Sequence, residues 1–222
     1  MDGWILKPCA FSFLKEFTLK SHMANALKIL IKNAVVTIFL FSFGCTQTHS
    51  PLLQRMAPFP RGAICRVAVL PFINQTEFSQ GELLFYRIFM GEMVRTGYEI
   101  AKEGDIRDIY RQMNIYPGML PDFEQIRVIA NRLDVQLVVV GTVNEMTDKT
   151  GADLNPTLAV TLQLHEAKTG RTILSTYHRR EGGQYRKVMH FGLVNTPMAL
   201  AKNMAREILD SWASAGLKQC SN

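Results

Sequence analysis

Residues 64–76 read Ile64-Cys-Arg-Val-Ala-Val-Leu-Pro-Phe-Ile-Asn-Gln-Thr76, and this stretch decides the fold. Its centre, Val67 to Phe72, is a short apolar run that contains a proline and is closed by polar residues. Periodicity does not separate a buried strand from a buried helix in so short a run, but its length and Pro71 favour a strand covered on both faces. We therefore expect this run to be the first strand of the folded domain.

Downstream of this strand, helical and extended patterns alternate. Residues 136–143 give the strongest strand signal because they are β-branched and apolar at their centre. Residues 157–166 alternate between apolar and polar side chains, and residues 171–180 return as the hairpin partner. Five other elements are expected. They are a helix at 79–96 capped by Ser79, a short strand at 98–101, and a helix at 105–113. A helix at 123–133 capped by Asp122 and a last helix at 196–216 opened by Thr196-Pro197 complete the set.

The order of these elements, β-α-β-α-β-β-β-α, is typical of an α/β layer fold. We expect an α/β domain (an α+β sandwich) whose mixed sheet has about five strands, with helices packed on the sheet. Phe123 should share the buried side of its helix with Ile126, while Glu207 should lie on the wet face of the last helix. The domain should span residues 63–216, with 217–222 as a tail.

The length, charge and cysteine spacing of the chain limit the functions that it can have. The chain has 222 residues, 47% of them hydrophobic, and a formal net charge of +6. Residues 1–44 contribute three of these charges, so the remainder is only mildly basic and does not predict nucleic-acid binding. None of the four cysteines forms a CxxC pair or a Cys/His cluster, so no zinc site is expected.

The segment before the domain has the pattern of a secretory signal. Lys28 and Lys32 form a positive region, and Ala34 to Phe43 is an apolar run too short for an ordinary membrane span. Residues 41–45, Phe-Ser-Phe-Gly-Cys, resemble the lipobox of bacterial lipoproteins. That resemblance implies cleavage after Gly44 and acylation of Cys45; the alternative is a plain membrane anchor with an incidental cysteine.

Two further expectations concern the residues on either side of this signal. Met23 would begin a signal of ordinary length, so we expect residues 1–22 to be an upstream segment produced by the choice of start codon and residues 23–44 to be the signal peptide. Residues 45–62 should be the acylated cysteine and a tether with extended bias, because Thr46 to Gly62 is polar and contains three prolines. These 17 residues could reach about 55 Å when fully extended.

Candidate chemistry in the domain is sparse. His165 and His178 could lie near each other across the hairpin, but we expect exposed strand histidines and no metal site. No serine-nucleophile or phosphate-loop motif is present, so we expect neither an enzyme nor a cofactor. Cys65 and Cys220 flank the domain and could form a disulfide in an oxidising compartment; the alternative is a buried thiol and a free thiol.

A basic cluster follows the hairpin. It consists of Arg179, Arg180, Arg186 and Lys187, with Tyr185 among them. The cluster could be a docking surface for an acidic partner or for lipid headgroups. The alternative is a solvated edge that discourages strand pairing.

Three signatures together resemble a superfamily of bacterial envelope domains: Val67-Ala-Val-Leu-Pro-Phe-x-Asn-x-Thr76, the strand 136–143, and Glu166-Ala-Lys-Thr-Gly-Arg171. This superfamily includes the TolB amino-terminal domain, the LpoB-like activators of penicillin-binding proteins and the CsgG-like secretion proteins. The resemblance implies an outer-membrane lipoprotein that faces the periplasm, and Thr46 after the cysteine fits outer-membrane sorting. It brings no catalytic residues.

These observations predict a non-enzymatic protein-binding module that reaches the membrane through its lipid anchor. Its partner would be an envelope protein, such as a cell-wall synthase that it regulates. The alternative is an accessory structural component of a CsgG-like secretion or flagellar envelope assembly, and self-association into a homo-oligomer stays open.

Overall fold

The computed structural model describes residues 49–116, 118–148, 155–187 and 191–220. The elements in chain order are β1 (Leu52–Arg55), β2 (Arg66–Val69), β3 (Ile73–Asn74), α2 (Gly81–Arg95), β4 (Glu99–Ile100), α3 (Glu103–Gln112), α4 (Phe123–Leu133), β5 (Leu137–Thr147), β6 (Thr157–Glu166), β7 (Thr172–Glu181), the 3-10 helix η1 (Gly182–Tyr185) and α5 (Pro197–Ser214). The predicted signal peptide, the cleavage after Gly44 and the acylation of Cys45 concern residues outside those that the structure describes.

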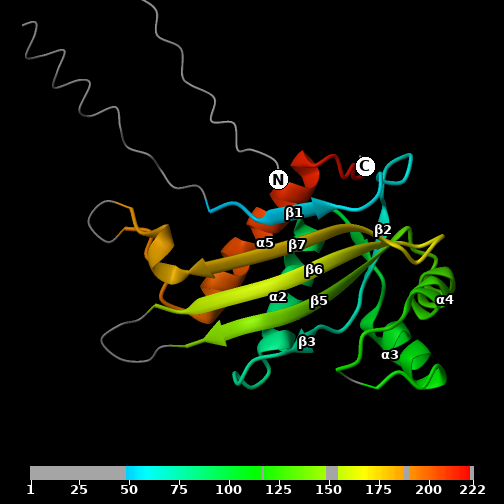
Figure 1. Ribbon diagram of the computed structural model, residues 1–222, viewed down its shortest axis with the longest axis horizontal. Helices are drawn as coiled ribbons and strands as arrows, with labels where there is room; N and C mark the ends of the chain where they lie inside the picture. The colour runs from blue at the N-terminus through cyan, green and yellow to red at the C-terminus, as the bar shows by residue number, and fades with distance from the viewer. Residues whose placement is uncertain (1–48, 117, 149–154, 188–190, 221–222) are drawn as a thin grey trace, which may run out of the picture. The chain divides into compact units, whose positions relative to one another are not determined.

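The described strands form one mixed sheet in the order β1-β7-β6-β5-β2-β4, with β3 also paired to β5. Strand β2 runs parallel to β4 and β5, and β3 also runs parallel to β5, whereas the pairs β5–β6, β6–β7 and β7–β1 are antiparallel. Figure 1 shows α2 and α5 behind β5, β6 and β7, and α3 and α4 at the end of the sheet beside β2. The predicted mixed α/β fold with helices on the sheet is confirmed; β1 and β3 are the two strands that the sequence reading did not include.

The apolar run at the start of the domain is covered on both faces, as predicted. Val67 and Val69 belong to the core beneath α2 and α5, and Ala68 and Leu70 belong to the core beneath α3 and α4. All four side chains are buried. Alternation along the strand explains this division, because successive side chains point to opposite faces.

The larger core lies between the sheet and the helices α2 and α5. Trp212 is its largest fully buried side chain, and its ring meets Phe89 edge-on at 5.7 Å between centroids. The indole Nε1 donates a hydrogen bond of 2.7 Å to Thr176 Oγ1 on β7, so the one polar atom of this ring is satisfied. This contact fixes α5 against β7.

The tether prediction was wrong for residues 52–55, which form β1. Leu52 pairs with Tyr177 and Arg55 with Leu174 in an antiparallel ladder against β7. The polar, proline-rich composition of the segment hides this strand, because only four residues between Pro51 and Pro58 are extended, and the free edge of β7 supplies their hydrogen-bond partners. The sheet therefore begins only seven residues after Cys45.

Residues 217–220, which the sequence reading assigned to a tail, belong to the domain. Leu217 is buried, and the backbone N–H of Ile64 donates to the carbonyl of Lys218 at 2.7 Å. Gln219 forms a parallel bridge with Ile64. Cys220 thereby comes beside Cys65, and the structure joins the two as a disulfide with 5.0 Å between their Cα atoms.

Two of the three predicted helix caps are present. The Asp122 side chain accepts from Gln125 N at the start of α4, and Thr196 accepts from Ala199 N at the start of α5. Ser79 does not cap α2: the helix begins at Gly81, after Gln80 in the left-handed conformation. The chain enters α2 from a tight turn, so the serine lies one residue too early to cap it.

Candidate functional site

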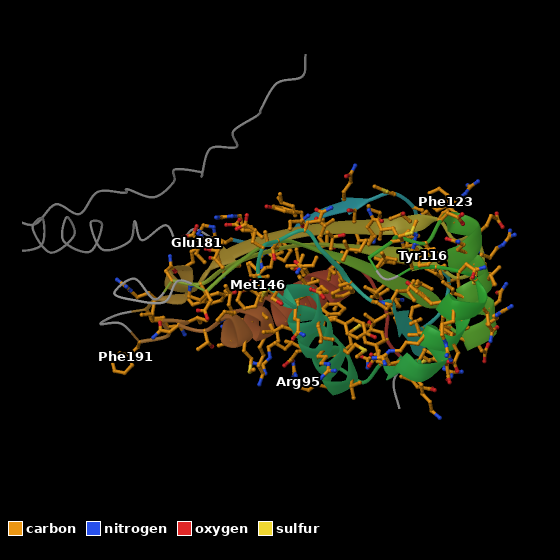
Figure 2. The ribbon with its side chains drawn as sticks, turned by 90° about the horizontal axis from the view of Figure 1, so that it is seen from below. Arg95, Tyr116, Phe123, Met146, Glu181 and Phe191 are labelled. Carbon is orange, nitrogen blue, oxygen red and sulfur yellow. A yellow bond between two sulfur atoms is a disulfide. The ribbon has the colours of Figure 1, made fainter. Side chains whose placement is uncertain are left out.

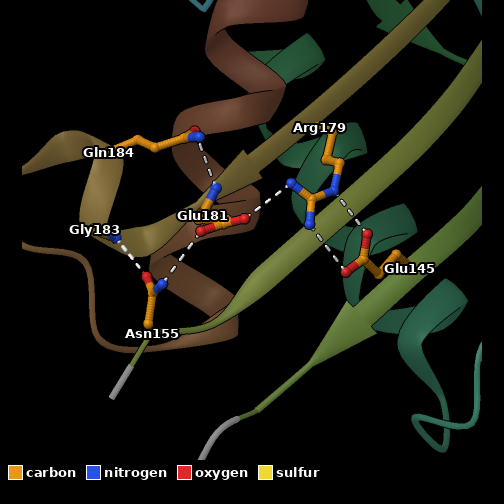
Figure 3. Close-up of polar contacts among 6 residues, drawn as sticks. All are labelled: Glu145, Asn155, Arg179, Glu181, Gly183 and Gln184. Atoms are coloured by element: carbon orange, nitrogen blue, oxygen red, sulfur yellow. Dashed lines mark hydrogen bonds and ion pairs between the residues drawn. The ribbon is translucent and has the colours of Figure 1, made fainter. Parts of the chain in front are cut away.

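Two of the four charged residues of the basic cluster, Arg179 and Arg180, are paired with carboxylates within the protein. Arg179 makes two hydrogen bonds to Glu145, at 2.8 and 3.3 Å, and a third to Glu181 at 2.9 Å (Figure 3). Arg179 and Glu145 both pair with Ala159 of the strand between them, whose small side chain lets them meet across it. The hydrogen bonds that Arg179 donates to Glu145 and Glu181 raise its pKa further, so it stays charged and paired.

The second oxygen of Glu181 helps to hold the turn after β7. Asn155 Nδ2 donates to Glu181 Oε2 at 3.4 Å, and Asn155 Oδ1 accepts from Gly183 N at 2.6 Å. Gln184 closes the turn by accepting from Glu181 N (Figure 3). These polar groups therefore stabilise η1.

Arg180 and Tyr185 point into the protein, which corrects their assignment to an open docking surface. Arg180 is only 8% exposed; its Nη2 donates to Glu207 Oε1 at 2.9 Å and its Nε to the Tyr185 hydroxyl at 3.2 Å. The guanidinium also lies 4.4 Å from the Tyr185 ring centroid. His178 Nε2 donates to the other oxygen of Glu207 at 2.6 Å.

Glu207 is the centre of this network. The sequence pattern placed it on the solvent-exposed face of α5, and that prediction was wrong. Burial alone would raise the pKa of Glu207, but hydrogen bonds from His178 and Arg180 outweigh burial and hold that pKa below its usual value. Arg206 is also engaged, since it donates to the buried Glu92 of α2 at 3.0 Å. Of the five residues in the expected docking cluster, Arg186 and Lys187 remain exposed and form no ion pair within the described part of the chain.

The two hairpin histidines are buried, not exposed as expected, and they lie apart. His178 pairs across the ladder with Val160, whereas His165 pairs with Thr172 near the turn. Strand alternation puts His178 on the face beneath α5 and His165 on the opposite face. Within the described residues, no group of three His, Cys, Asp or Glu side chains could hold a metal ion.

A second surface, which the sequence reading missed, lies at the start of α4. Met119, Leu120 and Phe123 are 57%, 53% and 60% exposed, and we call these three residues the α4 apolar patch. Phe123 was expected on the buried side of its helix, but it occupies the first helical position, before the apolar stripe turns toward the sheet. Figure 2 shows Phe123 and Tyr116 at the same end of the molecule.

A partly open pocket of about 190 Å³ adjoins the α4 apolar patch. It is lined mainly by apolar side chains from α4, β5 and the preceding loop, together with polar groups of Asp122, Gln163 and His165. The turn after β6 supports the patch from below, since a Cβ atom at Gly170 would overlap the carbonyl oxygen of Phe123. Gly170 also has a φ of +69°, a conformation that glycine adopts without strain.

His165 lines this pocket as a neutral ring. Its Nδ1 lies 3.0 Å from the carbonyl of Gly170, which fixes that nitrogen as the donor. Burial lowers the pKa of His165, and the hydrogen bond to Gly170 opposes this only in part. Its Nε2 is buried and has no partner among the described residues.

The shifted pKa of His165 predicts a loss of stability in mild acid. The unfolded chain takes up a proton near pH 6.5, the ordinary pKa of histidine, while the folded protein resists it. The stability due to the neutral ring should therefore be complete above pH 6.5 and be lost as the pH falls toward the lower folded pKa. Urea unfolding of the wild type and of His165→Gln at several pH values measures this difference. An imidazole that titrates at or above pH 6.5 by NMR would contradict the prediction.

No helix among the described residues has the length and apolar character needed to cross a membrane.

Comparison with known proteins places the fold but no family. No protein-family model and no curated protein matches the sequence. Among solved structures, a PelC dodecamer from Paraburkholderia phytofirmans matches 77% of this chain and 99% of its own, with a TM-score of 0.52 and 18% identity. The likeness therefore shows a shared fold.

Two further solved structures resemble the domain more weakly. Lipoprotein GNA1162 from Neisseria meningitidis matches with a TM-score of 0.46 and 13% identity, over 68% of this chain and 99% of its own. The LpoB C-terminal domain from Escherichia coli matches with a TM-score of 0.42 and 17% identity, over 55% of this chain and 87% of its own.

Proposed function

We propose that this protein is a lipoprotein, anchored through Cys45 at the periplasmic face of the outer membrane, that binds another envelope protein and catalyses no reaction. The positive region, the short apolar run and the Gly44-Cys45 pair support the anchor. PelC, which shares the fold, is a dodecamer, and this supports a role for the domain in protein–protein contacts.

The α4 apolar patch is the observation that carries the binding function. Three large apolar side chains lie within five residues of one another, each more than half exposed, and a mainly apolar pocket adjoins them. Contiguous exposed apolar surface beside a pocket is typical of protein interaction sites. An aromatic ring next to a flexible methionine is a common composition for the centre of such a site.

The backbone under the patch is held in place before any partner binds. Asp122 and Gln125 form a reciprocal capping box at the first turn of α4, with hydrogen bonds of 2.8 and 2.9 Å. Preorganisation of this kind lowers the entropy cost of association. The α4 apolar patch is therefore a better candidate surface than the basic cluster, in which Arg179 and Arg180 are already paired.

A cell-wall synthase is the first partner to test, because the sequence signatures resemble those of LpoB-like activators of such enzymes. Phe123→Asp should reduce recovery of the partner at least tenfold after crosslinking in intact cells, since truncating a central aromatic residue costs about 2 kcal/mol or more. Val94→Asp is the matched control, because Val94 is 58% exposed on α2, a different helix. Equal recovery with Phe123→Asp and wild type, at equal protein levels, would reject the patch as the binding surface.

An accessory ring component is the second candidate function. The observation that favours it is the PelC structure, a dodecamer with the same fold. Mass photometry of the protein purified from membranes separates the two functions. A uniform large oligomer would favour the ring component, and a monomer would favour the binding module.

A further inference from the structure

The position of β1 bears on how the domain faces its membrane. The proposed anchor, Cys45, and the first residue of β1, Leu52, are separated by six residues. A fully extended chain spans at most about 25 Å over that distance. A compact domain of this size is roughly 40 Å across, so the tether is shorter than the domain that it holds.

The surface at the end of this short tether is apolar. Leu52 and Met56 are 69% and 54% exposed, and Tyr177, the ladder partner of Leu52, is 41% exposed. Leu53 is also exposed, although it points to the opposite face of the strand from Leu52. The sheet edge thus presents apolar side chains on both of its faces. We call Leu52, Leu53, Met56 and Tyr177 the β1 edge patch.

The composition of this edge suits the interface between lipid and water. Tyrosine is enriched at that interface because its ring is apolar and its hydroxyl is polar. Arg61, a few residues beyond β1, is exposed and can approach lipid phosphates. Figure 1 shows β1 at the edge of the sheet beside β7, and no other strand among the described residues pairs with it.

We propose that the β1 edge patch lies against the lipid surface into which Cys45 is anchored, so that the domain is held at the membrane in a fixed orientation. The lipid anchor supplies the affinity, and the short tether keeps the patch at a high effective concentration near the surface. Weak apolar contacts are then sufficient to orient the domain. The α4 apolar patch belongs to a different element, the start of α4, and shares no residue with the β1 edge patch. This inference rests on the proposed anchor.

Tryptophan reporters test the proposal in the lipid-anchored protein. Leu52→Trp or Tyr177→Trp is introduced into the full chain, and the protein is purified from membranes and reconstituted into vesicles of phosphatidylethanolamine and phosphatidylglycerol that contain brominated chains. Brominated lipids quench only nearby indole rings. Phe123→Trp is the matched control, since that position is similarly exposed but belongs to α4, which packs on β5, whereas β1 pairs with β7. The native Trp212 is fully buried and supplies a constant background.

Quenching at positions 52 and 177 should be several-fold stronger than at position 123. Equal quenching at all three positions, in protein that floats with the vesicles, would overturn the orientation and leave the anchor intact. Flotation of the same samples separates the two failures. If Cys45→Ala floats as well as the wild type, Cys45 is not the membrane anchor, and the proposed orientation is rejected together with the anchor.

Discussion

Replacing Glu207 with alanine should lower the free energy of unfolding by about 3 kcal/mol, the largest effect that we expect from a single polar substitution. The variant leaves Arg180, which is 8% exposed, without its carboxylate partner and removes the acceptor of His178. Breaking a buried ion pair by removing one partner costs about 3–5 kcal/mol, because the remaining charge is desolvated and unpaired. The lower end applies here, since 27% of the Glu207 side chain is exposed. Urea denaturation followed by circular dichroism measures the change.

Two comparisons separate the pair from a general effect of changing α5. Asp210→Ala removes an exposed acid from the same helix and should change stability little. The double variant Arg180→Met, Glu207→Leu should be considerably more stable than Glu207→Ala, because no charge is left unpaired. If Glu207→Ala and Asp210→Ala unfold at the same urea concentration, the network does not stabilise the fold.

The pH dependence of this pair follows from the lowered pKa of Glu207. The stability that the ionised carboxylate contributes should be present above its ordinary pKa of 4.5 and be lost as the pH falls through the lower folded pKa. The loss due to His165 begins near pH 6.5, at a higher pH than the loss due to Glu207, which begins near pH 4.5.

Local pattern was sufficient to predict the centre of the sheet. Residues 67–72 and 136–143 are so apolar that only a position covered on both faces satisfies them, and β2 and β5 pair there. The alternation along residues 157–166 likewise determines which face of β6 meets the core. The missed strands β1 and β3 are only four and two residues long, and they exist because longer neighbours offer them hydrogen bonds.

The basic hairpin shows why charge in a sequence is a poor guide to a surface. Alternation along β7 puts Arg180 on the same face as His178, so the local pattern alone predicts that the Arg180 side chain points toward the core. The partner that makes this position tolerable, Glu207, lies on α5 and 27 residues later in the chain. No local pattern connects the two, and a charged run therefore suggested an exposed surface.

The α4 apolar patch escaped prediction for a related reason. Phe123 follows a capping residue and precedes an apolar stripe, so its hydrophobicity appeared to extend that stripe. Phe123 instead lies in the first turn of α4 and is 60% exposed. The close approach of Gly170 to the carbonyl oxygen of Phe123, a contact between distant parts of the chain, fixes the position of that turn. A residue at a helix end can thus be apolar and exposed within a regular amphipathic pattern.

Removing both cysteines of the Cys65–Cys220 pair, as the Cys65→Ser, Cys220→Ser double variant, should lower the free energy of unfolding by about 2–4 kcal/mol under oxidising conditions. The two residues are 155 positions apart, so the bond closes almost the whole domain into a loop. In the chain-entropy account, a longer closed loop restricts the unfolded chain more strongly. The Cα separation of 5.0 Å lies within the range that native disulfides adopt, so the backbone is already placed for the bond.

Reductant provides the matched control for this prediction. Dithiothreitol should lower the urea midpoint of the wild type to that of the double variant and leave the variant unchanged. The backbone bonds between Ile64 and residues 218–220 do not involve sulfur, so the fold should persist in both reduced forms. Two titratable thiols in the unfolded wild type without reductant, with identical midpoints in all samples, would show that the cysteines are free. The last residues would then depend on those backbone bonds and on the burial of Leu217 alone.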